Sequence, residues 1–192
     1  MGKILAVNGS PRREGNTAHM LGTVLNLCAA AGHETEMVQI GGLPTRDCVA
    51  CGGCGQHPGR CAIDDWMNAL YAKMAAADAI LLGSPTYFAD LTPELKAVID
   101  RTGSVSRRDG NRFSRKIGAG VCAVRRAGSI HALDSINHFF LINDMIVPGS
   151  GYWAMSLARE AGEYEKDAEG AATMTRLGEN IVWILEKLSS IS

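Results

Sequence analysis

The chain has 192 residues and a mass of 20.4 kDa, which suits one self-sufficient domain that buries about 70% of its unfolded surface. A formal net charge of −1 and a pI near 6.5 exclude a general attraction to nucleic acid or anionic lipid, so electrostatic recognition must be local. The chain opens with a predicted strand rather than a signal peptide and has no apolar run long enough to cross a membrane. We therefore expect a cytoplasmic protein that contacts neither membrane nor nucleic acid.

Hydrophobic periodicity predicts an alternation of strands and helices along the whole chain. Strands are expected over 3–8, 34–40, 79–83, 117–124 and 145–147. Helices are expected over 17–31, 64–77 with Asp64 as N-cap, 92–101, 130–142 and 171–188. The pattern predicts an α/β fold, a doubly wound five-stranded parallel sheet with helices on both faces, because right-handed crossovers lay helices on the sheet.

Four of the six cysteines lie within fourteen residues, in an insert at about 41–64 between the second strand and the second helix. They are Cys48, Cys51, Cys54 and Cys61. Their opening C-x2-C-x2-C spacing is that of a bacterial ferredoxin run, and the glycines between them permit a tight wrap, so we expect one 4Fe-4S cluster. Structural zinc, a disulfide and metal-free thiols that pack a loop remain open alternatives.

Ligands of such sheets bind where the strands end, and the loop after the first strand has the features of an anion site. Gly9-Ser10-Pro11-Arg12 is followed by Gly15-Asn16-Thr17 at the start of a helix. The helix-start amides, two hydroxyls, an amide side chain and a guanidinium form a phosphate cradle from Ser10, Arg12, Asn16 and Thr17. The spacing matches neither a Walker loop nor G-x-G-x-x-G, which favours a monophosphate; a plain Ser-Pro turn is the alternative.

The loop after the third strand carries two adjacent aromatic residues. It reads Pro85-Thr86-Tyr87-Phe88 and follows a fully apolar strand. Such a loop offers a planar ligand a stacking surface, although aromatic side chains also pack under ordinary turns. Together with the first loop it predicts a ligand in which a phosphate is attached to a flat ring.

These motifs resemble the flavodoxin-like NAD(P)H-dependent FMN reductase superfamily, and within it the iron-sulfur flavoproteins. The resemblance covers most of the chain and rests on the two loops, on Leu95-Lys96 with Asp100-Arg101, and on the place of the cysteine insert. It implies a single FMN-binding domain over 1–192. It also implies that the first-loop residues bind the FMN phosphate, that Pro85, Thr86, Tyr87 and Phe88 lie along the flavin, and that Arg125 and Gly128 of the fourth-strand loop contact the ring from the other side.

The resemblance implies an FMN-dependent oxidoreductase that passes electrons from NAD(P)H via FMN to a flavin, a quinone or another small acceptor. An electron carrier between a ferredoxin-like donor and FMN is an alternative, and a non-redox module with a zinc-stapled cysteine loop is another. The basic segment 101–116 is a candidate for binding a dinucleotide phosphate, with a solvated loop or a subunit contact as alternatives. The long segment 148–170, which contains Tyr152 and Trp153, is expected at an oligomer contact, in a homodimer or homotetramer.

Overall fold

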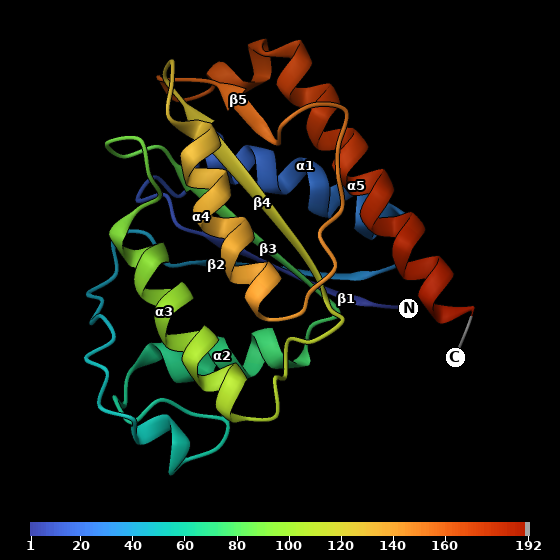
Figure 1. Cartoon of the computed structure of the whole chain (residues 1–192). Coiled ribbons are helices and arrows are strands. Elements are labelled where there is room, and N and C mark those ends of the chain that lie inside the picture. The colour runs from blue at the N-terminus through green and yellow to red at the C-terminus, as the bar shows by residue number, and fades with distance from the viewer. Residues whose placement is uncertain (191–192) are drawn as a thin grey trace.

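The computed structural model describes residues 1–190 and contains one five-stranded sheet (Figure 1). Its strands are β1 (Lys3–Asn8), β2 (Glu34–Gln39), β3 (Ala79–Pro85), β4 (Ile117–Val124) and β5 (Met155–Leu157). All neighbouring strands are parallel, in the order β2-β1-β3-β4-β5. The chain moves outward from β1 to β2 and then returns past β1 to β3, so a topological switch point lies between β1 and β3. The predicted five-stranded α/β fold is confirmed.

Helices cover both faces of the sheet. The structure has α1 (Asn16–Ala30), α2 (Trp66–Ala76), α3 (Pro93–Arg108), α4 (Ser129–Ile142) and α5 (Ala168–Ser189), with short 3-10 turns η1 (Gly53–Gly55) and η2 (Glu163–Lys166). Side chains of β1 alternate between two cores, because successive strand residues point to opposite faces. Leu5 and Val7 pack in the core under α2, α3 and α4, whereas Ile4 and Ala6 pack in the core under α1 and α5.

The predicted fifth strand at 145–147 is wrong. Within that segment only Ile146 forms an isolated bridge, with Ile117 at the start of β4. The edge strand is Met155–Leu157, which pairs with Cys122 to Val124 at the other end of β4. Met145 is buried because it packs in the hydrophobic core. The apolar residues at 145–147 therefore reflect core packing and not a strand.

Helix boundaries also differ from the prediction, and two of the differences affect residues discussed below. The N-cap of α2 is Asp65, whose carboxylate accepts from the Met67 amide at 3.1 Å, while Asp64 pairs with Arg60. Helix α3 continues to Arg108, seven residues beyond the predicted end, because the buried face of the helix persists through Val105. The basic segment 101–116 is therefore half helical, and it is not a solvated loop throughout.

The loops after β1, β2 and β3 are tied together at the carboxyl edge of the sheet. The Gly9 amide donates to the Gly83 carbonyl at 2.8 Å, and the Thr92 hydroxyl donates to the Gly9 carbonyl at 3.0 Å. A Cβ atom on Gly41 would come within 2.2 Å of the Ser10 backbone, so only glycine allows that approach. Among residues 1–190, no helix is long and apolar enough to span a bilayer.

Candidate functional site

A cavity of about 180 Å³ lies at the carboxyl edge of the sheet, between the loops that follow β1, β3, β4 and β5. Eight of the ten predicted cofactor residues line it: Ser10, Arg12, Asn16, Thr17, Pro85, Thr86, Tyr87 and Arg125. Pro11, Ala123, Ala158 and Arg159 complete the lining. Motifs that are up to 115 residues apart in the sequence therefore meet around one hollow, as expected at a topological switch point.

The first loop holds itself in a fixed turn and leaves helix-start amides free. The Ser10 amide donates to the Asn8 side chain at 3.1 Å, and the Arg12 amide donates to the Ser10 hydroxyl at 3.2 Å. The N-cap of α1 is Gly15, which has no side chain to cap the helix. In the described chain the first amides of α1 donate to no other group, so they can bind an anion together with the positive end of the helix dipole.

The Asn16 side chain forms hydrogen bonds with the segment that follows β5. Its side chain donates to the Glu160 carbonyl at 2.8 Å and accepts from the Tyr164 amide at 3.2 Å. These contacts hold residues 158–164, which we call the strap, over the start of α1. The Arg12 guanidinium donates to the Arg159 carbonyl at 3.2 Å and reinforces the contact. The Asn16 side chain therefore positions the strap, and its backbone amide and second side-chain N–H stay free of protein partners in the described chain.

Sequence reasoning missed Ala158 and Arg159 because the strap follows the misplaced fifth strand. Once Met155–Leu157 is recognised as the edge strand, the next residues lie at the carboxyl edge of the sheet like the other loops. The sequence signal was weak, since β5 has only three residues. Pro11 lies between the predicted residues Ser10 and Arg12, and Ala123 lies two residues before Arg125, so both are near predicted positions.

The third-loop turn places Phe88 away from the cavity. Tyr87 and Asp90 exchange backbone hydrogen bonds of 2.7 and 3.0 Å, with Phe88 and Ala89 between them at φ of +46° and +68°. These are the dihedral signs of a type I′ turn, which is normally built from asparagine and glycine. Phe88 is fully exposed at the tip, whereas Tyr87 lines the cavity. Phe88 therefore does not line this cavity, and its contact with a flavin stays a prediction.

Gly128 lies behind the cavity wall and does not line it. It caps α4 at a φ of +96°, and a Cβ atom there would come within 2.7 Å of the Ala89 Cα atom. Glycine is needed because the fourth loop packs directly against the turn of the third loop. Arg125, three residues earlier, does line the cavity and has no ionic partner among the described residues.

All four clustered cysteines line a second cavity, of about 160 Å³, together with Ile63, Arg101, Ser104 and Arg108. The thiols are free: Cys48 and Cys51 are exposed, and Cys54 and Cys61 are half-buried. Within residues 1–190, no three Cys, His, Asp or Glu side chains are close enough to hold one metal ion. In a cubane cluster each thiolate binds a different iron, so four thiols spaced around one hollow fit that donor set better than they fit a single zinc ion.

Helix α3 separates the two cavities. Its N-cap Thr92 is bonded to the first loop, while its C-terminal half lines the cysteine cavity. The cavities share no lining residue. At 1.5 Å per residue, Thr92 and Arg101 are about 14 Å apart along the helix axis. The two cavities therefore lie toward opposite ends of α3.

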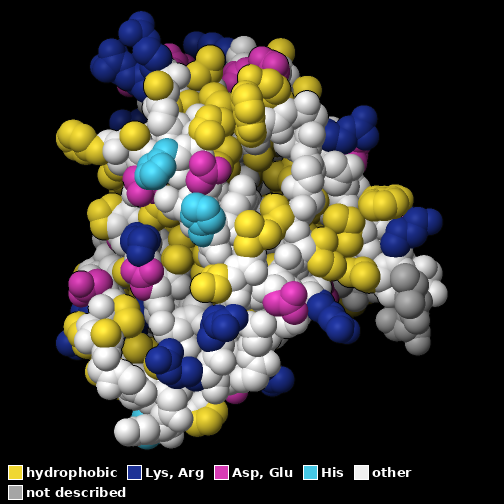
Figure 2. All heavy atoms as spheres, viewed as in Figure 1, with side chains coloured by type: hydrophobic (Ala, Val, Ile, Leu, Met, Phe, Trp, Pro, Cys, Tyr) yellow, Lys and Arg dark blue, Asp and Glu magenta, His cyan; other side chains and the backbone are white. Residues whose placement is uncertain are grey.

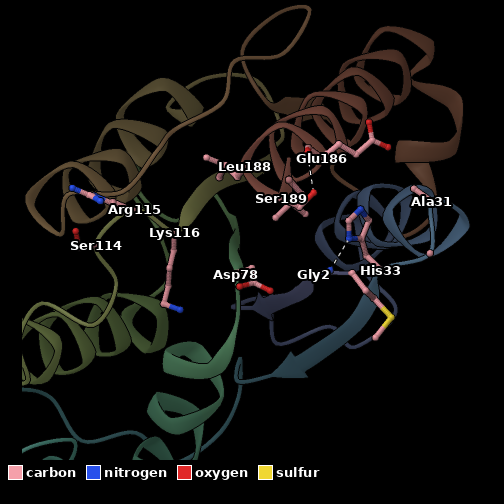
Figure 3. Close-up of a pocket in the computed structure, with 13 residues that line it drawn as sticks. Gly2, Ala31, His33, Asp78, Ser114, Arg115, Lys116, Glu186, Leu188 and Ser189 are labelled. Carbon is pink, nitrogen blue, oxygen red and sulfur yellow. Dashed lines mark hydrogen bonds between the residues drawn. The ribbon is translucent and has the colours of Figure 1, made fainter. Parts of the chain in front are cut away.

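A larger hollow, of about 650 Å³, lies at the amino edge of the sheet (Figure 3). The Gly2 amide donates to His33 at 3.0 Å, and Asp78 accepts from the Lys3 amide at 2.8 Å. Burial lowers the pKa of Lys116 on the other side of this hollow. The end of the basic segment 101–116 lines it, through Arg115 and Lys116. Parallel sheets bind ligands at the opposite edge, however, so size alone does not make it the functional site.

The comparisons with known proteins agree with the geometry. The sequence profile of the NADPH-dependent FMN reductase family matches residues 2–160. An iron-sulfur flavoprotein of Methanocaldococcus jannaschii is 32% identical over 191 residues, covering 96% of this chain and 97% of that protein. The chain belongs to this FMN reductase family, in its iron-sulfur flavoprotein branch.

Two further similarities support the family and the fold of this FMN reductase relative. The iron-sulfur flavoprotein of Methanosarcina thermophila is 32% identical, with 96% of this chain and 95% of that protein covered. A solved flavodoxin from the domain Archaea shares the fold with a TM-score of 0.64 at 16% identity, covering 96% of this chain and 99% of that one. As a member of the family, the chain is an FMN-binding oxidoreductase.

Proposed function

We propose that this FMN-binding oxidoreductase is a two-centre electron-transfer flavoprotein, with FMN in the carboxyl-edge cavity and one 4Fe-4S cluster on the four cysteines. The observation that carries the proposal is that eight of the ten predicted cofactor residues line one cavity of the fold and all four clustered cysteines line another. When bound, FMN supplies chemistry in one-electron and two-electron steps, and the cluster supplies one-electron chemistry. The protein contributes position, electrostatics and access.

The start of α1 would hold the FMN phosphate. Its free amides, the Ser10 and Thr17 hydroxyls and the Arg12 guanidinium are the donors available on this side of the cavity. Arg12 is already oriented by its hydrogen bond to the strap, so less side-chain freedom is lost on binding. This set suits a monophosphate.

The third and fourth loops would hold the flavin ring. Pro85, Thr86 and Tyr87 line one side of the cavity, and the Thr86 amide is fixed by the Ala123 carbonyl at 2.9 Å. Arg125 brings a positive charge to the same cavity. A cation there would stabilise the reduced flavin, which carries more negative charge than the oxidised flavin.

The cysteine cavity would hold the cluster. The support comes from its four thiols and from the names of relatives in Methanocaldococcus jannaschii and Methanosarcina thermophila, both described as iron-sulfur flavoproteins. Figure 2 shows Lys and Arg side chains over the C-terminal half of α3, where Arg107 and Arg108 are exposed. Such a surface suits an acidic, ferredoxin-like electron donor.

NAD(P)H as direct donor to the flavin is the second candidate. The description of the matched family as NADPH-dependent favours it. Arg12, Arg125 and Arg159 surround the carboxyl-edge cavity and would suit the phosphates of a dinucleotide. The two candidates differ in where electrons enter the protein.

Anaerobic stopped-flow absorbance at the flavin band separates the candidates. Wild type and Cys54→Ala are mixed with NADH, NADPH or a reduced bacterial-type ferredoxin. The two-centre proposal predicts that ferredoxin reduces the flavin of the wild type and that Cys54→Ala loses this reaction while it still binds FMN. Reduction by NADPH that is equally fast in both proteins, with none by ferredoxin, would establish the second candidate instead.

A further inference from the structure

Arg101 is the largest fully buried side chain, and it lines the cysteine cavity. It lies on α3, nine residues after the N-cap Thr92, and its side chain is 1% exposed. Arginine is seldom buried unless it is paired or has a specific task. In the sequence it belongs to the Asp100-Arg101 motif, whose role neither the FMN site nor the sheet explains.

Four of the five N–H donors of Arg101 are used to fix the guanidinium. Nη1 donates to the Asp65 carboxylate at 2.7 Å and to the Arg46 carbonyl at 3.0 Å. Nη2 donates to the other carboxylate oxygen of Asp65 at 2.8 Å and to the Ile63 carbonyl at 3.1 Å. The paired contact with one carboxylate sets the plane of the group, and the two carbonyls belong to the segments that flank the cysteine loop.

The fifth donor, Nε–H, is buried and has no hydrogen-bond partner within residues 1–190. A buried donor left unpaired is costly, so its retention needs an explanation. Cys61 lines the same cavity as Arg101 and interacts with it electrostatically. Burial lowers the pKa of Arg101, but the hydrogen bonds to Asp65 outweigh burial, so the pKa is raised overall.

Cys61 is also held in place from the opposite side. Its amide donates to the Asn68 side chain at 2.8 Å, and the Asn68 side chain donates back to the Cys61 carbonyl at 3.3 Å. Helix α2 therefore fixes the backbone of Cys61, while α3 supplies the buried cation. The other cation of this cavity, Arg108, is exposed, and no carboxylate pairs with it in the described chain.

We propose that Arg101 is a positioning residue for the iron-sulfur centre: its Nε–H donates to the Cys61 sulfur when the cluster is bound, and its fixed charge raises the reduction potential. The inference rests on the proposed function of the cysteine cavity. One-electron reduction adds one negative charge to the cluster and its thiolates, breaks no bond and needs no proton. A buried cation and an N–H donor to sulfur both stabilise the more negative state.

Isotope labelling of the wild type tests the contact without any substitution. Protein containing arginine labelled with ¹⁵N only at Nε is reconstituted anaerobically with ferrous iron and sulfide and then reduced with dithionite. Pulsed paramagnetic resonance of the reduced cluster should show one ¹⁵N coupling that is absent from unlabelled protein. A labelled sample without an arginine coupling would overturn the proposal.

Matched substitutions test the effect on the potential. Arg101→Gln and Arg108→Gln remove the same charge from the same cavity, one buried and one exposed. Arg101→Gln should lower the ratio of reduced to oxidised cluster at a fixed potential at least tenfold, which corresponds to about 59 mV for one electron. Arg108→Gln should shift it less, because water screens an exposed charge. Equal shifts in the two variants would contradict the proposal.

Three controls separate the possible failures. FMN binding by Arg101→Gln shows that the variant folds, and if it does not fold, the labelling result on wild type decides the matter. Arg101→Lys keeps the charge but loses the planar fork, so it should recover only part of the shift. Wild type that takes up no iron under anaerobic conditions would defeat the proposed function and this inference together, whereas iron-loaded variants with unchanged potentials would defeat the inference alone.

Discussion

Asn16 donates a hydrogen bond of 2.8 Å to the carbonyl of Glu160, 144 residues away in the sequence. The contact joins the start of α1 to the strap. It therefore holds Arg159 in the lining of the cavity to which the start of α1 also contributes. The Asn16 side chain, which the sequence motif assigns to the ligand, therefore also holds the strap residues that line the cavity. The phosphate site and the strap are one structural unit, and substitutions in one should affect the other in predictable ways.

Asn16→Ala should lower the free energy of unfolding of the FMN-free protein. Two hydrogen bonds are lost, and the Tyr164 amide, which is buried, is left without its acceptor, so a loss of about 1–3 kcal/mol is expected. Urea unfolding measures this directly. If the stability is unchanged and only FMN affinity falls, Asn16 is a direct phosphate ligand as the sequence motif implied.

Arg12→Ala should weaken FMN binding more than tenfold and leave riboflavin binding nearly unchanged. A charge-assisted contact to the phosphate is worth about 1.5–3 kcal/mol, and riboflavin has no phosphate. Arg13→Ala is the matched control, because Arg13 is an adjacent exposed arginine that does not line the cavity. Similar losses for both ligands, or for both variants, would show that Arg12 does not contact the phosphate.

Gly128→Ala should destabilise the fold by about 1–3 kcal/mol. The residue sits at a φ of +96°, and an added Cβ would come within 2.7 Å of the Ala89 Cα atom, so both backbone strain and a clash oppose the change. Gly149→Ala is the control, because a Cβ there meets nothing within 4 Å. Thermal unfolding of the two variants should differ clearly, and equal midpoints would refute this account of the fourth loop.

Asp65→Asn should destabilise the protein by about 3 kcal/mol or more near neutral pH, because Arg101 then stays buried without its counter-charge. Asparagine still caps α2, so the loss reports on the ion pair. The hydrogen bond from Arg101 holds the pKa of Asp65 below its usual value of about 3.9. A lowered folded pKa gives stability that is present above the unfolded pKa and is lost as the pH falls through the folded pKa.

The wild type should therefore lose stability steeply as the pH falls below about 4, and Asp65→Asn should show a flatter dependence over that range. Asp64→Asn provides the comparison, because Asp64 is exposed and pairs only at the surface with Arg60. Its stability curve should follow that of the wild type. Urea unfolding midpoints from pH 2 to pH 7 give the three curves. Parallel curves for all three proteins would show that Asp65 does not cause the loss of stability at low pH.

Much of the sheet and of the cavity could be predicted because their signals are local. Strands β1, β3 and β4 are largely apolar runs with clear ends, and parallel strands bring the residues that follow them to one edge. The short strand at Met155–Leu157 lacks periodicity, so its place on β4 depends on tertiary packing that no local pattern reveals. For the same reason the strap residues Ala158 and Arg159 were missed.

Local chemistry also cannot say which way a loop side chain points. Phe88 was predicted beside a ring, but the left-handed turn at Phe88 and Ala89 directs it to solvent. Asp64 and Asp65 are equivalent as cap residues in sequence, and Arg101 selects Asp65 only through contacts formed after folding. Such choices depend on partners distant in sequence.

The central claim is that one chain holds two redox centres, and counting them tests it most directly. Protein reconstituted anaerobically with FMN, ferrous iron and sulfide is desalted and analysed for iron and flavin per chain, beside Cys54→Ala. The account predicts one FMN in both proteins, and about four iron atoms in the wild type only. A wild type that binds FMN but stays free of iron, or a variant that retains the same iron, would contradict it.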